Sequence, residues 1–291
     1  MARSSAQLLD DDEELDLATF MLDACGIDYS NFFQDERILT RENLEKNLKF
    51  LRKMIDNRFS RRAPYFVFGY FILVTGANMP EDLRHKILDN TKWEDEESKW
   101  LIQNNIIERK IYLNDFSEKV RKHVQGQKLH PIRLIYLNGK NDLYTKYRAN
   151  TIIGNNEFNK ACKDGRIYRT KHINLQGWDL KEIPKIIFKI KNLESLSLDY
   201  NQIKEISEDI LELTSLKILS LDYNEFHEFP GSITKLSVIE DLSFDNNYIS
   251  EIPESINNLR SLKTLYIRKN KIEKIPEYIE TGKLKIFYSY F

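Results

Sequence analysis

The chain has 291 residues, a formal net charge of −1 at pH 7 and two cysteines. This length allows two compact units. The near-neutral charge argues against a general nucleic-acid binder, because neutralising phosphates needs a surplus of Lys and Arg. Cys25 and Cys162 lie far apart in the sequence, without the spacing of a metal site or a redox motif, which indicates a reducing compartment.

The N-terminus and the most apolar segment bear on localisation. Leu8 and Leu9 are followed directly by the acidic residues 10–14, so the apolar core of a signal peptide is missing. The most apolar run, residues 65–77, is shorter than the roughly 20 residues that a membrane span needs. We therefore expect a cytoplasmic protein with no membrane span.

Residues 1–169 contain no repeat, and their pattern predicts a mostly helical domain. Thr40 can cap a helix whose apolar residues follow at helical spacing: Leu44, Leu48, Leu51 and Ile55. Residues 65–74 are apolar all round and predict a central helix that ends near Gly76. A further helix is predicted to start at Pro80, and two more at about 94–108 and 115–124.

The segment before the repeats mixes turn signals with short apolar runs. Residues 132–137 predict a short strand or a docking segment, closed by a turn at Asn138-Gly139. Residues 157–163 predict a short helix that leads into the repeats. Because the first turn of a solenoid exposes its core, something here must cap it. Tyr168 and Trp178 are the candidates for that role.

From Thr170 onward the sequence repeats every 23 residues. The pattern L-x-x-L-x-L-x-x-N-x-I-x-x-I occurs in four copies, and Pro follows it in three of them. A degenerate copy precedes them, with Trp178 in place of the Asn, and a sixth begins at Leu284. One repeat of this length cannot bury its own apolar face, so stacking must form the core.

This pattern resembles the leucine-rich repeat, over roughly the last two fifths of the chain. The resemblance implies a curved solenoid with a parallel sheet on its concave side, where such proteins usually bind other proteins. We therefore expect an α+β chain of two domains: a helical domain over residues 1–169 that includes the solenoid cap, and a leucine-rich-repeat domain over residues 170–291.

The L-x-L part of each repeat should be a strand with Leu facing the core and the intervening residues facing solvent. Aligning the copies then predicts exposed columns on the concave face. They comprise a serine column (Ser197, Ser220, Ser243), an aspartate column that continues to Arg268 (Asp199, Asp222, Asp245), and a column with two tyrosines (Tyr200, Tyr223). In the last full repeat the sign inverts, with Lys263, Arg268 and Lys269.

Two explanations of the aspartate column remain open. The three acids can be a feature inherited when the repeat was duplicated, since like charges across strands cost little in water. Alternatively they receive Lys or Arg side chains of a protein partner with a basic patch, with the tyrosines adding rigid contact area. The predicted partner-binding residues are therefore Asp199, Tyr200, Asp222, Tyr223, Asp245 and Arg268.

Other polar columns predict structural or solvated roles. Asn201, Asn224, Asn247 and Asn270 should satisfy backbone groups at the strand exits. Four glutamates, Glu182, Glu205, Glu228 and Glu251, should form a solvated face. The predicted helix near residue 46 carries Lys46, Lys49, Arg52 and Lys53, which suits either a solvated face or contact with an anionic surface.

Motifs for catalysis are missing from the sequence. Gly139-Lys140-Asn141 lacks the earlier glycine and the Ser or Thr of a phosphate-binding loop. The five histidines have no zinc-ligand spacing. We expect no cofactor, no metal and no enzymatic activity, and hence an intracellular protein-binding module. The alternatives are an enzyme or effector in the N-terminal domain that the repeats target, and a scaffold in which the repeats pack on that domain.

Overall fold

The computed structural model describes residues 12–58, 62–95, 103–132, 151–279 and 284–288. The chain divides into two compact units, residues 1–134 and 135–291. Within the described part, no helix is both long and apolar enough to cross a membrane.

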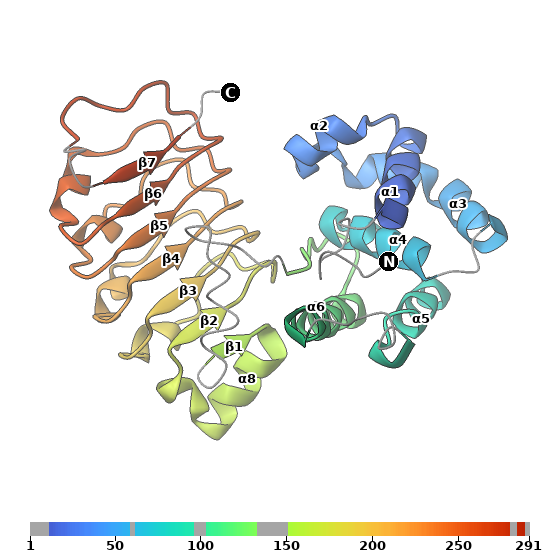
Figure 1. The fold of residues 1–291 in the computed structure, drawn as a ribbon, viewed down its shortest axis with the longest axis horizontal. Coiled ribbons are helices and arrows are strands. Elements are labelled where there is room, and N and C mark those ends of the chain that lie inside the picture. Colours follow the sequence, from blue (N-terminus) through green and yellow to red (C-terminus); the bar gives the residue numbers. More distant parts are fainter. Residues whose placement is uncertain (1–11, 59–61, 96–102, 133–150, 280–283, 289–291) are drawn as a thin grey trace. The chain divides into compact units, whose positions relative to one another are not determined.

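The first unit is helical (Figure 1). Its α-helices are α1 (Asp12–Ala24), α2 (Tyr29–Gln34), α3 (Arg41–Arg58), α4 (Ala63–Thr75), α5 (Glu81–Asp89) and α6 (Gln103–Lys122). Short 3-10 helices occur at Glu36–Ile38 and Trp93–Asp95.

The predicted helix after Thr40 is α3, and its cap is confirmed. The backbone N–H of Asn43 donates to Thr40 Oγ1 at 3.2 Å, which satisfies one of the free donors of the first turn. Leu44, Leu51 and Ile55 are buried. The helical spacing of these apolar residues therefore marks the core face of α3.

The predicted central helix is α4, which packs against α1, α3, α5 and α6. It ends at Gly76, whose φ of 71° places it in the left-handed region that glycine adopts without strain. Gly69, in its middle, permits a close approach, since a Cβ there would lie 2.9 Å from the ring of Phe116. α5 follows Pro80 as predicted, with Leu83 and Ile87 buried.

The prediction of separate helices at 94–108 and 115–124 is wrong. One helix, α6, runs from Gln103 to Lys122 through the expected break. The sequence between Arg109 and Asp115 contains no Gly or Pro, so nothing interrupts the backbone hydrogen bonds. Asp115 is part of a buried pair inside the helix, with Lys119 Nζ 2.9 Å from its Oδ2. The predicted strand or docking segment and turn, residues 133–139, lie outside the described residues.

The second unit is a seven-stranded parallel sheet in sequence order (Figure 1). The strands are β1 (Thr151–Ile153), β2 (His172–Asn174), β3 (Ser195–Ser197), β4 (Ile218–Ser220), β5 (Asp241–Ser243), β6 (Thr264–Tyr266) and β7 (Lys285–Phe287). α8 (Asn155–Asp164) follows β1, and 3-10 helices occur at Arg166–Arg169, Ile187–Lys189, Glu208–Glu212, Ile233–Lys235 and Glu254–Asn258.

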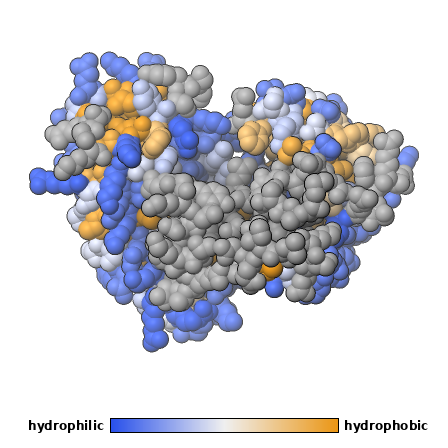
Figure 2. All heavy atoms as spheres, in the orientation of Figure 1, coloured by the Kyte–Doolittle hydropathy of each residue, from blue (hydrophilic) through white to orange (hydrophobic). Residues whose placement is uncertain are grey.

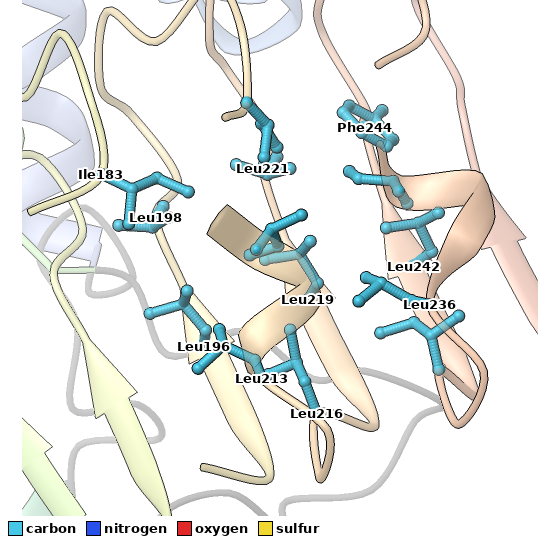
Figure 3. Close-up of a cluster of buried hydrophobic side chains, with 14 of the residues drawn as sticks. Ile183, Leu196, Leu198, Leu213, Leu216, Leu219, Leu221, Leu236, Leu242 and Phe244 are labelled. Carbon is cyan, nitrogen blue, oxygen red and sulfur yellow. The ribbon is translucent and has the colours of Figure 1, made fainter. Parts of the chain in front are cut away.

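The predicted register of the repeats is confirmed. Leu196, Leu219 and Leu242 are direct partners on neighbouring strands. The leucines of successive repeats lie in layers between the strands and the opposite side of the solenoid (Figure 3). Leu219 and Leu221 are fully buried. Each layer therefore buries the apolar face of the next, which supports a continuous core.

Leu221→Ala is expected to destabilise the repeat unit by about 3 kcal/mol, since it opens a cavity in the middle of the stack. The measurement is the urea midpoint of the purified chain. Leu211→Ala is the matched control, because Leu211 is only half-buried and should lose less. Equal losses from the two changes would contradict the observed packing.

Residues 151–167 cover the first end of the solenoid. β1, which the sequence did not predict, pairs with β2, and α8 is the predicted short helix. Ile152, Phe158 and Ile167 are buried in the same core as the repeats. Trp178 is buried as expected of a capping residue, whereas Tyr168 is 49 % exposed, so its predicted capping role is wrong.

Removing residues before Thr170 is therefore expected to broaden the thermal unfolding transition of the repeat unit and to lower its solubility. The deletion takes away β1 and α8 and exposes the apolar residues of β2. The comparison is a fragment of residues 135–291, which retains both elements, followed by circular dichroism on heating. An equally sharp transition in both fragments would show that the first repeat needs no cap.

Candidate partner-binding surface

The sheet face opposite the leucines carries the predicted serine and aspartate columns, but most of these side chains are buried. Ser220 is 2 % exposed and Asp199 is 0 % exposed. Asp222 is half-buried. The expectation that both columns face solvent is therefore wrong, although the alternation that places them opposite the core is correct.

Each aspartate accepts hydrogen bonds from the next repeat, which compensates for the burial of Asp199 and Asp245 and the half-burial of Asp222. Asp199 Oδ1 accepts from Ser220 Oγ at 2.6 Å and from the backbone N–H of Asp222 at 2.8 Å. Asp222 Oδ1 accepts from Ser243 Oγ at 2.5 Å and from the backbone N–H of Asp245 at 2.7 Å. The same pair of bonds thus recurs one repeat later, and it joins consecutive strand exits.

The ladder ends in a charged residue of the chain itself. Asp245 accepts from the backbone N–H of Arg268 at 2.6 Å and from its Nε at 2.8 Å and Nη2 at 2.5 Å. At the other end, Asp199 Oδ2 accepts from Ser197 Oγ at 2.8 Å and from Gln176 Nε2 at 3.1 Å. We call the three aspartates and three serines of these columns the Ser–Asp ladder: Asp199, Asp222 and Asp245 with Ser197, Ser220 and Ser243.

Burial makes the Ser–Asp ladder electrostatically different from three acids in water. Loss of solvent raises the pKa of Asp199 to about 6. The pKa of Asp222 is raised well above its ordinary value by burial and by the charges of Asp199 and Asp245. Burial also raises the pKa of Asp245, while the guanidinium of Arg268 opposes that rise.

Ser220→Ala is expected to cost about 1–2 kcal/mol, because it leaves an oxygen of the buried Asp199 without one of its donors. The urea midpoint measures the loss. Ser207, on the outer side, is an exposed control whose replacement by Ala removes only a bond to the backbone of Asp209. A smaller loss for Ser220 than for Ser207 would contradict the role of the ladder.

The column after the aspartates has left-handed backbone. Tyr200 and Tyr223 have φ of 56° and 54°, and Asn246 and Lys269 follow at 58° and 52°. Tyrosine is costly there, whereas Gly and Asn adopt this region readily. The two tyrosine rings stack at a centroid distance of 4.2 Å with 11° between their planes. Both tyrosines are half-buried, so part of the surface of this ring pair is exposed.

Arg268 stands beside a second aromatic pair. Its side chain is 51 % exposed, and its guanidinium carbon lies 5.5 Å from the ring centre of Tyr266. Tyr266 stacks on Phe287 at 4.8 Å with 10° between the planes. This end of the sheet thus presents Arg268, just after β6, together with one aromatic ring from β6 and one from β7.

At the strand entrances the charges alternate along one column: Lys171, Glu194, Lys217, Glu240 and Lys263. Glu194 Oε1 lies 2.5 Å from Lys171 Nζ, and Glu240 pairs with Lys263. The pKa of Glu194 is lowered, mainly by its hydrogen bond from Lys171. Figure 2 shows the hydrophilic side chains that project from the edge of the repeat unit. These glutamates therefore add little net acidity to the face.

The remaining predicted columns have the roles expected of them. The asparagines Asn201, Asn224, Asn247 and Asn270 are buried and bond to backbone groups of two repeats. The glutamates Glu182, Glu205, Glu228 and Glu251 are exposed. In the first unit, Lys46, Lys49 and Lys53 lie on the exposed side of α3, while Arg52 pairs with Asp82.

The described residues contain no group of three or more His, Cys, Asp or Glu side chains that could hold a metal ion. The aspartates of the Ser–Asp ladder instead direct their oxygens at hydroxyl and backbone donors. The sequence offered a signal for this arrangement: Ser and Asp recur together two residues apart in three successive copies.

The comparisons with known proteins identify the repeats. The leucine rich repeat family model matches residues 169–226 and 214–272. No curated protein matches the chain.

Three similar solved structures illustrate the extent of the likeness. A leucine-rich repeat protein of Leptospira interrogans is 26 % identical, with 43 % of this chain and 32 % of that chain covered and a TM-score of 0.38. An internalin of Listeria monocytogenes is 25 % identical, with 42 % and 35 % covered and a TM-score of 0.37. The ectodomain of the receptor kinase SOBIR1 of Arabidopsis thaliana is 28 % identical, with 40 % and 66 % covered and a TM-score of 0.34.

This chain therefore spans less than two thirds of the length of each of these three proteins. The family match, the 23-residue period and the buried leucine and asparagine columns all concern the same part of the sequence. Residues 169–272 of this chain are leucine-rich repeats.

Proposed function

We propose that this protein is a non-enzymatic, cytoplasmic binding module that holds a protein partner on the strand-bearing, concave face of its repeats. Leucine-rich repeat domains generally mediate protein–protein interactions. The observation that carries the proposal is the pair of aromatic stacks on that face, Tyr200 with Tyr223 and Tyr266 with Phe287. Half-exposed tyrosines supply contact area at a low cost in side-chain entropy.

The six predicted partner-binding residues divide into two groups in this proposal. Tyr200, Tyr223 and Arg268 make the direct contacts, and the half-buried Asp222 borders them. Asp199 and Asp245 act through the others, because their carboxylates are buried and fix the backbone of the next strand. We do not propose a basic patch on the partner. The carboxylates that suggested one accept hydrogen bonds from donors of this chain instead.

A cytoplasmic location is supported by the thiols. Cys25 is buried and Cys162 half-buried, and both are free. Burial raises the pKa of each, so both stay protonated and unreactive at neutral pH. Thiols of this kind suit a reducing compartment.

The test is partner retention from a cytosolic extract by the immobilised full chain. In a double variant, Tyr200→Asn and Tyr223→Asn, the rings are lost but the left-handed backbone is kept, as Asn246 shows one repeat later. We expect retention to fall about tenfold, mainly through faster dissociation. The matched control is Glu205→Gln with Glu228→Gln, two exposed residues of another column.

The outcome separates the concave face from other surfaces. A partner retained equally by the tyrosine variant and by the unchanged chain would overturn the proposal. If retention is instead lost on changing Lys46, Lys49 and Lys53 of α3 to Gln, the first unit carries the binding.

A further inference from the structure

One edge of the Arg268 guanidinium, at Nη1, can bind a ligand from outside the chain. Its Nε and Nη2 donate to Asp245 Oδ2. In the described part of the chain, no residue accepts a hydrogen bond from Nη1. The side chain is nevertheless held in place, because the ion pair to Asp245 fixes one edge and the Tyr266 ring lies 5.5 Å from the guanidinium. A fixed guanidinium binds a carboxylate with little loss of side-chain entropy.

The surroundings of Arg268 are cationic and aromatic. Lys269 is exposed beside it, and Lys285 is exposed on β7, on the same face as Phe287 because the two are separated by one residue. Phe287 is 41 % exposed. The acid nearest to Arg268, Asp245, is 5 % exposed and turned inward to its own hydrogen bonds. Arg268 and Lys285 therefore place exposed positive charge at this end of the sheet.

We propose that the β6–β7 end of the concave face binds an acidic segment of the partner protein, in which an Asp or Glu carboxylate accepts hydrogen bonds from Nη1 of Arg268. An apolar or aromatic neighbour of that acid packs on Tyr266 and Phe287. The inference rests on the proposed function and assigns the partner's charge. A nucleic acid would need a larger cationic surface, whereas the chain as a whole has a net charge of −1.

The pairing of Arg268 with Asp245 suits this role. Asp245 orients the guanidinium without competing for the outer edge, as the supporting carboxylate of a binding site does. The negative charge of Asp245 partly neutralises the guanidinium of Arg268 in their ion pair. Removing the charge of Asp245 should therefore strengthen the positive field at the surface. The response to a change of Asp245 therefore reports the sign of the partner's charge.

The experiment uses the full chain and short fluorescent peptides that alternate tryptophan with glutamate, glutamine or lysine, with fluorescence anisotropy as the readout. We expect the glutamate peptide to bind about tenfold more tightly than the glutamine peptide, and the difference to shrink at high salt. Equal affinity for these two peptides, or no binding of either at millimolar concentration, overturns the inference.

Two variants test whether Arg268 is the binding residue. Arg268 is changed only together with Asp245, because changing it alone would leave the buried carboxylate of Asp245 without its ion pair. Asp245→Asn alone should keep or increase the affinity for the glutamate peptide. Adding Arg268→Gln in that background leaves no unpaired acid and should weaken binding about tenfold. Lys204→Gln, which breaks a surface pair with Glu225, is the control and should change nothing. Equal affinity of Asp245→Asn and the double variant would contradict the assignment to Arg268.

The peptides also distinguish failure of this inference from failure of the proposed function. If the lysine peptide binds most tightly, and the Tyr200→Asn and Tyr223→Asn variant weakens it, the concave face is the binding surface but the partner is basic. If the glutamate peptide binds and that tyrosine variant has no effect on it, the β6–β7 site for an acidic segment stands on its own.

Discussion

Asn224→Ala is expected to destabilise the repeat unit by about 5 kcal/mol, because one buried amide satisfies four backbone groups. Asn224 Oδ1 accepts from the backbone N–H of Ile203 at 3.0 Å. Its Nδ2 donates to the carbonyls of Leu198 at 3.0 Å, Leu221 at 3.1 Å and Asp222 at 3.2 Å. These partners belong to two neighbouring repeats, so the change removes hydrogen bonds that hold the two repeats together.

The loss is measured from urea midpoints of the full chain. Asn258→Ala is the matched control: Asn258 is an exposed asparagine at the end of a 3-10 helix, and its replacement should cost less than about 0.5 kcal/mol. Asn224→Asp keeps the shape but loses both donors, so it should be nearly as damaging as alanine. A loss below about 1 kcal/mol for either change at Asn224 would mean that water replaces the amide.

The repeats were predictable from the sequence because one physical constraint recurs in each copy. Each repeat buries a leucine at the same position of its strand: Leu196, Leu219 and Leu242. The period therefore fixes both the strand register and the face that is apolar. The asparagines follow from the same logic, since a polar residue that recurs beside buried leucines needs backbone partners.

The exposure of the opposite face could not be predicted in the same way. Alternation says which side of the strand Asp199 lies on, but not where its carboxylate turns. Its partners, Ser220 and the N–H of Asp222, are more than twenty residues away in the sequence. These residues come close together only when the repeats stack. The hydrogen bonds between them therefore cannot be predicted from the pattern of a single strand.

In the first unit, prediction succeeded where a strong local signal marked an end. Thr40 begins α3, Pro80 begins α5, and Gly76 ends α4. It failed in α6, which continues through the expected break because no Gly or Pro lies between Arg109 and Asp115. The side chain of Asp115 bonds to Lys119 and to the N–H of Ile132, a contact fixed by tertiary packing.

The stability of the repeat unit is expected to depend on pH through two buried groups that act in opposite directions. Burial raises the pKa of Asp199 to about 6, so the folded state holds its proton more tightly than the unfolded state does. Burial lowers the pKa of His172 to about 4, so there the unfolded state binds the proton more tightly. As pH falls from about 7 to 4, Asp199 therefore stabilises the fold, and His172 destabilises it.

Since the pKa of Asp222 is also raised, the acids should outweigh the histidine. We expect the unchanged repeat unit to be more stable at pH 5 than at pH 7, and His172→Gln to enlarge that gain by about 2 kcal/mol. In Asp199→Asn with Asp222→Asn, two of the three raised acids are gone, and Arg268 opposes the rise of the third, Asp245. The effect of His172 should then dominate, so the sign should reverse, and the unit should lose about 2 kcal/mol between pH 7 and pH 5. Comparing each variant with itself removes the fixed cost of its substitutions.

The measurement is the urea midpoint at each pH, followed by the fluorescence of Trp178, which is buried in the repeat core. Trp93 and Trp100 are changed to Phe so that the signal reports this unit alone. The carboxylates with lowered pKa, such as Glu194, titrate below their ordinary values and therefore act mainly under pH 5. A midpoint that falls between pH 7 and pH 5 by the same amount in the unchanged ladder and in the double Asn variant would show that the ladder carboxylates stay ionised. It would also show that their hydrogen bonds from Ser220, Ser243 and the backbone outweigh the effect of burial.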